Sequence, residues 1–95
     1  MAKKRELKKD IDFLVNEVIS DCYTYLYLNG TKKQDQVIDL MNEVVEKRNE
    51  LIYRVNHSEK KDDKKQTREY FKSIFNDLLV MVDHSFSKLS ELTKA

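Results

Sequence analysis

The side chains best suited to metal binding or nucleophilic chemistry are few: one cysteine, Cys22, and two histidines, His57 and His84. Helical spacing places Cys22 on an apolar stripe and His84 on a polar one. In an antiparallel bundle of helices His57 would lie roughly 30 Å from the other two. A Cys–His pair would also lack an orienting third group. We therefore expect Cys22 to act as a small buried hydrophobe and predict no catalytic residue, no metal ligand and no cofactor.

Arg48 is a charged residue at the centre of an otherwise apolar helical stripe. The stripe consists of Val37, Met41, Val44, Leu51 and Val55. A buried guanidinium must be paired, because an uncompensated charge in the core is strongly destabilising. Antiparallel packing would bring Asp10 and Glu17 near the same height. We predict a core ion pair of Arg48 with Asp10 or Glu17. The alternatives are an arginine that reaches solvent and one that binds an anion in a cleft.

Acidic residues follow one face of the same segment: Asp35, Asp39, Glu43, Glu46 and Glu50. Helical bundles that hold metals through carboxylates combine inward-facing Glu with a Glu-x-x-His motif, which the sequence lacks. A phosphate-binding loop is also excluded, because one glycine cannot build it. We predict a solvated face on which Glu43–Lys47 and Glu50–Arg54 form i,i+4 ion pairs.

Basic residues cluster at the N-terminus and again between residues 60 and 65. This candidate basic pole comprises Lys3, Lys4, Arg5, Lys60, Lys61, Lys64 and Lys65. If three helices alternate in direction, both clusters lie at one end and could contact the phosphates of a nucleic acid. Interspersed acidic residues and the lack of a short helix-turn-helix element weaken that interpretation. Nucleic-acid association is therefore the alternative function.

Composition sets the class of protein. The chain has 95 residues, enough for a single domain. Charged residues make up 37%, yet the formal net charge is only +1, so the surface is dense in charge but balanced. The single cysteine cannot form an internal disulfide and suits a reducing compartment. No apolar run is long enough for a signal peptide or a membrane span. We expect a cytoplasmic protein that does not enter membranes.

The scarcity of helix-breaking residues favours long helices, because proline is absent and Gly30 is the only glycine. Gly30 can end a helix in the left-handed conformation. Thr31 and Gln34 then fit a capping box that starts the next helix. A polar stretch at 56–63 marks the second break. We predict helices at about 4–28, 32–56 and 64–93, forming an all-α, antiparallel, up-down-up three-helix bundle, with residues 1–95 as one domain.

Apolar residues recur at spacings of three and four within each predicted helix, as expected for amphipathic helices. In the first helix they are Leu7, Ile11, Leu14, Val18, Cys22 and Leu26. In the third they are Phe71, Ile74, Phe75, Leu78, Val82, Phe86, Leu89 and Leu92. With the stripe around Arg48, these residues form the predicted core.

The first helix also carries an uncharged face opposite its apolar stripe. This aromatic face consists of Phe13, Asn16, Ser20, Tyr23, Thr24 and Tyr27. A helix with two uncharged faces is usually buried on both, and a three-helix monomer would cover only one. Aromatic side chains recur at interfaces, and two-fold dimers are the commonest oligomers. We predict a non-enzymatic protein–protein interaction module, a homodimer built on this face, with a different protein as a further partner. The alternative is that these are ordinary scattered exposed aromatics.

The first eleven residues resemble the start of other proteins. The segment Met1-Ala2-Lys3-Lys4-Arg5-Glu6-Leu7-Lys8-Lys9-Asp10-Ile11 resembles the start of a group of short, uncharacterised bacterial all-helical proteins. The resemblance implies a bacterial, cytosolic origin and an all-α fold. It implies no activity and no site residue.

Overall fold

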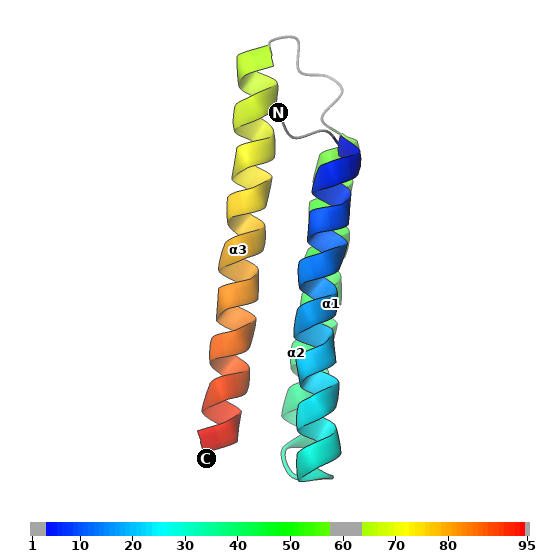
Figure 1. Ribbon diagram of the computed structural model, residues 1–95, viewed down its shortest axis with the longest axis vertical. Coiled ribbons are helices and arrows are strands. Elements are labelled where there is room, and N and C mark those ends of the chain that lie inside the picture. The colour runs from blue at the N-terminus through cyan, green and yellow to red at the C-terminus, as the bar shows by residue number, and fades with distance from the viewer. Residues whose placement is uncertain (1–3, 58–63, 95) are drawn as a thin grey trace.

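The computed structural model describes residues 4–57 and 64–94. They form three helices, α1 (Lys4–Asn29), α2 (Gln34–Asn56) and α3 (Lys64–Lys94). Helix α2 runs antiparallel to α1 and α3 (Figure 1), and each helix contacts the other two. The bundle is a rod of 50 × 17 × 17 Å. The predicted all-α three-helix bundle is confirmed for this part of the chain.

None of the three helices combines the length and the apolar character that a membrane crossing requires.

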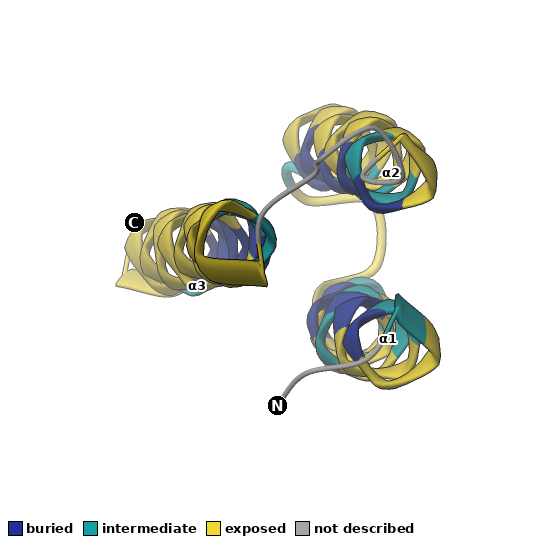
Figure 2. Cartoon of the chain, turned by 90° about the horizontal axis from the view of Figure 1, so that it is seen from above, coloured by how far each residue is buried: buried dark blue, intermediate teal, exposed yellow. Residues whose placement is uncertain are grey.

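The core is a single column of side chains between the helices. Viewed along the rod, the buried stripes of all three helices turn towards one another (Figure 2). The most deeply buried apolar side chains are Leu7, Ile11, Val18, Cys22, Val37, Leu40, Val44, Leu51, Val55, Ile74 and Leu78. The burial of these apolar side chains in one shared cluster is the main favourable contribution to the stability of the fold.

The predicted core differs from the observed one at the edges of the stripes. Tyr25, Leu40, Met81 and Ser85 are buried although they were not in the predicted core. Their predicted neighbours are only half-buried (Leu14, Leu26, Met41, Phe86, Leu92) or exposed (Phe75).

The helical period explains the exchange in α1. A helix turns about 100° per residue, so Tyr25 returns to within about 20° of Val18, whereas Leu26 is about 80° away. The Tyr25 hydroxyl donates a hydrogen bond to the carbonyl oxygen of Leu92 at 3.2 Å. This bond satisfies the polar end of a ring that is otherwise buried.

The turn between α1 and α2 uses two left-handed residues. Gly30 has φ 60° and its N–H donates to the Leu26 carbonyl oxygen at 2.9 Å, which ends α1 as predicted. The predicted capping box at Thr31 is wrong: α2 begins at Gln34, whose N–H donates to the Thr31 carbonyl oxygen rather than to its side chain. The N-cap is Lys33, at φ 57°, and its Nζ donates to the Leu92 carbonyl oxygen at 3.1 Å. That tether to α3 offsets the strain of the left-handed backbone at a lysine.

Candidate functional site

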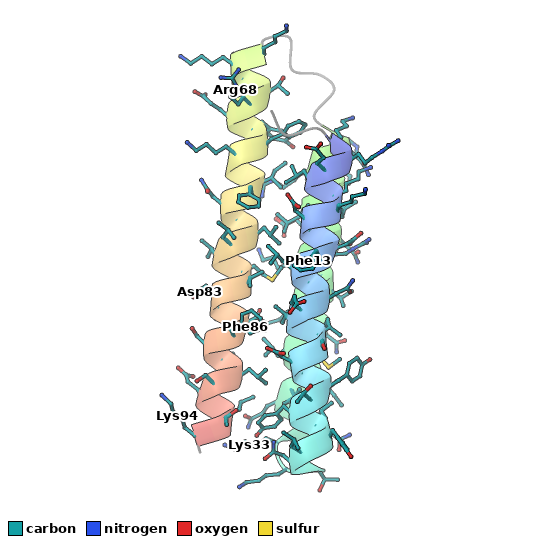
Figure 3. The ribbon with its side chains drawn as sticks, in the orientation of Figure 1. Phe13, Lys33, Arg68, Asp83, Phe86 and Lys94 are labelled. Carbon is teal, nitrogen blue, oxygen red and sulfur yellow. The ribbon has the colours of Figure 1, made fainter. Side chains whose placement is uncertain are left out.

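The aromatic face of α1 is open to solvent along its whole length. All six of its residues are exposed. Phe13, Tyr23 and Tyr27 expose 63%, 61% and 82% of their surface, and Phe13 projects from the middle of α1 in Figure 3. The Thr24 hydroxyl donates to the Ser20 carbonyl oxygen at 3.1 Å, within the helix. The face therefore presents large aromatic groups separated by small polar ones.

The contacts of Asp12 and Tyr25 show which flank of α1 faces which neighbour. Asp12 contacts Arg48 on α2, and Tyr25 contacts Leu92 on α3. Between residues 13 and 28, α1 has only two charged residues, Glu17 and Asp21. The helical period places both on the flank of Tyr25, away from α2. From Leu14 to Leu28 the aromatic face therefore continues towards α2 without meeting a charge on α1, and beside Phe13 the charge on that flank is Asp12, which is paired with Arg48.

On α2, two exposed aliphatic residues extend the aromatic face. Ile38 and Val45 are 40% and 46% exposed. They are seven residues apart, so they lie on one line along the helix, on the same flank as Arg48. Sequence reasoning had not assigned them to the interface. The available signal was a pair of apolar residues beside the core stripe, at a spacing that keeps them on one line.

Arg48 pairs with a different residue from the one predicted. Its Nε donates to Asp12 Oδ1 at 2.9 Å, and the two side chains are 38% and 48% exposed. The predicted core pair with Asp10 or Glu17 is wrong, and both of those residues are exposed. Asp10 lies at a similar height but about 200° around the helix from Asp12. Its side chain is therefore on the flank turned to α3.

We expect Asp12→Ala to lower the free energy of unfolding by no more than about 1 kcal/mol, because solvent screens a half-exposed pair. Asp10→Ala is the matched control, with an expected change within about 0.5 kcal/mol. Urea denaturation measures both, and high salt should shrink the Asp12 effect. A loss of about 3 kcal/mol at Asp12 would instead indicate a desolvated pair.

The ion pairs predicted on α2 are replaced by others. Lys47 pairs with Glu50 at 3.4 Å, not with Glu43, and Arg54 pairs with Asp77 at 2.6 Å, not with Glu50. The predicted i,i+4 pairs are therefore wrong. The reason is that α3 offers Arg54 a carboxylate across the helix interface, which an isolated helix lacks.

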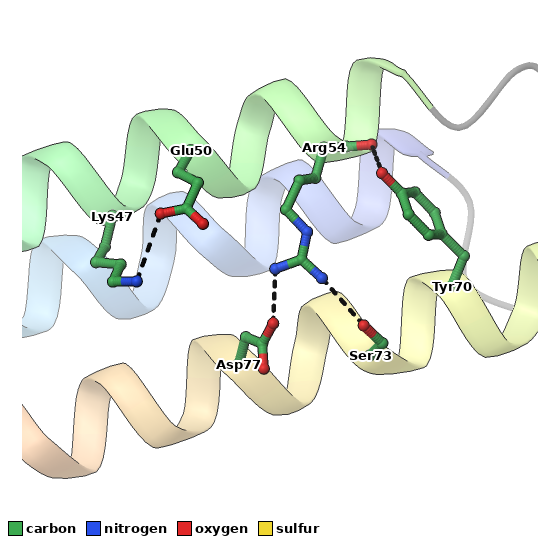
Figure 4. A network of polar contacts seen from close by, with 6 residues as sticks. All are labelled: Lys47, Glu50, Arg54, Tyr70, Ser73 and Asp77. Atoms are coloured by element: carbon green, nitrogen blue, oxygen red, sulfur yellow. Dashed lines mark hydrogen bonds and ion pairs between the residues drawn. The ribbon is translucent and has the colours of Figure 1, made fainter.

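The guanidinium of Arg54 links α2 to α3 through both of its terminal nitrogens. Nη1 contacts the Asp77 carboxylate, and Nη2 donates to Ser73 Oγ at 3.0 Å (Figure 4). The Tyr70 hydroxyl donates to the Arg54 carbonyl oxygen at 2.8 Å. The hydrogen bond with Asp77 raises the pKa of Arg54, although burial opposes this. This planar, two-pronged binding is characteristic of arginine and sets the register of the two helices.

Comparison with protein-family models, with curated proteins and with solved structures gave no match for this chain.

A groove of about 440 Å³ runs between α2 and α3, beside the Arg54 contacts. Its polar lining includes His84 and Ser85. Ser85 is buried, and its hydroxyl donates to the Met81 carbonyl oxygen at 2.9 Å. The charged residues Lys47, Glu50, Arg54 and Asp77 in its lining are paired with one another. The groove thus combines an apolar floor with these two ion pairs and with Glu43, a third carboxylate in its lining.

The cysteine and the two histidines, which are the side chains best suited to bind a metal, lie in different surroundings. Cys22 is fully buried, and burial raises the pKa of its thiol, with a further contribution from the charge of Asp21. His57 stacks on Tyr53 with 3.8 Å between ring centroids, and its Nδ1 lies 2.8 Å from the Tyr53 carbonyl oxygen. His84 is exposed beside the groove. Within residues 4–57 and 64–94, no three His, Cys, Asp or Glu side chains are grouped so that they could hold a metal ion.

Part of the candidate basic pole can be placed. Lys4 and Arg5 begin α1 and Lys64 and Lys65 begin α3, and these two helix starts lie towards the same end of the rod (Figure 1). Lys3, Lys60 and Lys61 lie outside the described residues. Binding of nucleic acid by this pole stays a prediction.

Proposed function

We propose that the protein is a non-enzymatic protein-interaction module that self-associates through the aromatic face of α1. The observation that supports this is the exposure of Phe13, Tyr23 and Tyr27 on a helix face that carries no charge between Phe13 and Tyr27. An aromatic side chain offers about 200 Å² for burial, so the three exposed rings present roughly 400 Å². A standard interface buries about 800 Å² on each partner. The rings supply half of that area, and Ile38 and Val45 add to it.

A second copy suits this face better than a charged partner does. Two uncharged faces can meet without bringing like charges together, and a net charge of +1 gives weak long-range repulsion between copies. A two-fold interface uses the same patch on both subunits, so one face is sufficient to build it. The surface left after dimerisation would then serve a different protein.

Molar mass in solution tests the proposal. We expect size exclusion with light scattering to give twice the chain mass for the wild type over a wide concentration range. Phe13→Glu/Tyr27→Glu should give the mass of one chain, because each copy would bury two new carboxylates without partners. Circular dichroism should show an unchanged helical content, since both side chains are exposed in the monomer.

The matched control is Tyr53→Glu/Val80→Glu. Both residues are similarly exposed but lie outside the aromatic face. Each double variant changes the net charge from +1 to −1, so a general charge effect would appear in both. We expect the control to remain dimeric. A wild type with the mass of one chain at every concentration would refute self-association, and a monomeric control would show that the aromatic face is not responsible.

A further inference from the structure

Five of the six residues of the aromatic face are arranged symmetrically about Ser20; the sixth, Tyr23, has Glu17 as its counterpart. Phe13 and Tyr27 lie seven residues before and after it, and Asn16 and Thr24 lie four residues before and after it. Spacings of four and seven are close to one and two helical turns, so these five residues form a band along α1, in which Asn16 and Thr24 are about 80° apart. Large rings stand at both ends of the band, and the smallest side chain is at its centre.

We infer that two copies pack their α1 helices antiparallel about a two-fold axis through Ser20, an inference that rests on the proposed self-association. In a two-fold interface, if residue i meets residue j, then j meets i. An axis at Ser20 places Phe13 against the partner's Tyr27 and Asn16 against the partner's Thr24. Each of these contacts occurs twice, and Ser20 meets its own copy. The sequence spacing is therefore self-complementary in this direction.

The side chains fit this pairing. Ser20 at the crossing point allows the helix axes to approach to about 8–10 Å. The ring pairs on either side can then adopt tilted or offset contacts. The Thr24 hydroxyl donates within its own helix, so its oxygen keeps acceptor capacity for the amide of the partner's Asn16.

The same two-fold symmetry brings α2 of both copies into the interface. A two-fold axis perpendicular to antiparallel helices keeps α2 on the same side of the interface in both copies. Asp12 contacts Arg48, so Ser20, eight residues further on, lies level with about residue 40 of α2. Ile38 and Val45 lie on either side of that level and are exposed. The flanks that carry them would face each other beside the α1 pair and enlarge the interface.

Disulfide trapping tests the pairing. We expect Ser20→Cys to form a covalent dimer under mild copper-catalysed air oxidation. Asn16→Cys or Thr24→Cys alone should not, because each lies about 12 Å along the axis from its own copy, and a disulfide needs Cα atoms within about 7 Å. An equal mixture of tagged Asn16→Cys and untagged Thr24→Cys should give the mixed dimer. The wild type is the control, since its Cys22 is fully buried.

Light scattering on the same samples separates the two proposals. Crosslinking of Asn16→Cys and of Thr24→Cys with their own copies would indicate a parallel pair and overturn the inference. A dimeric mass without any of the expected crosslinks would also overturn it, while self-association would stand. A mass of one chain would overturn both.

Discussion

Truncating Leu78 to alanine is expected to lower the free energy of unfolding by about 3 kcal/mol, within the range of about 2–5 kcal/mol typical of buried leucines. Leu78 is fully buried near the middle of α3. The loss has two parts: the hydrophobic burial free energy that the removed carbon atoms no longer contribute, and the cost of the cavity that they leave. A domain of this size is stabilised by roughly 5–10 kcal/mol in total. The substitution would therefore remove a large part of the stability.

Urea denaturation followed by circular dichroism measures the effect, at one fixed protein concentration because a dimer couples unfolding to association. Val80→Ala is the control, two residues further along the same helix but mostly exposed. We expect it to change the stability by less than about 0.5 kcal/mol. A loss below about 1 kcal/mol for Leu78→Ala would contradict tight packing of α3 against the other helices.

The thiol of Cys22 is expected to react with a thiol-specific reagent at least about 100-fold more slowly in the native protein than in urea. Two causes act together. The side chain is fully buried, and its raised pKa reduces the fraction of thiolate, which is the reactive form. Absorbance of the released chromophore gives both rates. Equal rates would show that α1 opens freely at this position.

The same pKa shift predicts how stability responds to alkaline pH. Below the ordinary value of 9.0 the thiol is protonated in both the folded and the unfolded chain. Above that value the unfolded chain loses its proton first, so the folded state binds more protons and stability falls as the pH rises. Comparing the wild type with Cys22→Ala isolates this contribution from lysine and tyrosine titration. A loss that is equal in both proteins would contradict the shift.

Much of the fold follows from local signals. The first predicted helix, 4–28, is observed as Lys4–Asn29, and the third, 64–93, as Lys64–Lys94. Gly30 gives the end of the first helix, and the polar stretch at 56–63 together with the apolar period gives the bounds of the third, because these signals act within a few residues. The start of α2 was misplaced by two residues. There the backbone at Lys33 and its tether to Leu92 decide the cap, and that tether joins residues 59 positions apart.

The exposure of the aromatic face could also be predicted from the sequence, since a helical period fixes the angle of a residue such as Tyr27 relative to the core stripe. The partner of Arg48 could not be predicted in this way. The period gives the height of Asp10 and Asp12 and their angles, but the handedness of the bundle decides which flank faces α2. The Arg54–Asp77 pair was missed for the same reason. Contacts between helices depend on this arrangement, whereas exposure depends mainly on the period.

The rod shape has a hydrodynamic consequence. The radius of gyration is 15.5 Å, against about 12 Å for a compact chain of this length. A single 11.4 kDa chain 50 Å long diffuses more slowly than a sphere of equal mass, so it leaves a gel-filtration column early. Two rods joined side by side across Ser20 double the mass while adding mostly width. Elution volumes of monomer and dimer would thus differ by less than their masses do, and scattered intensity, which follows mass directly, separates them.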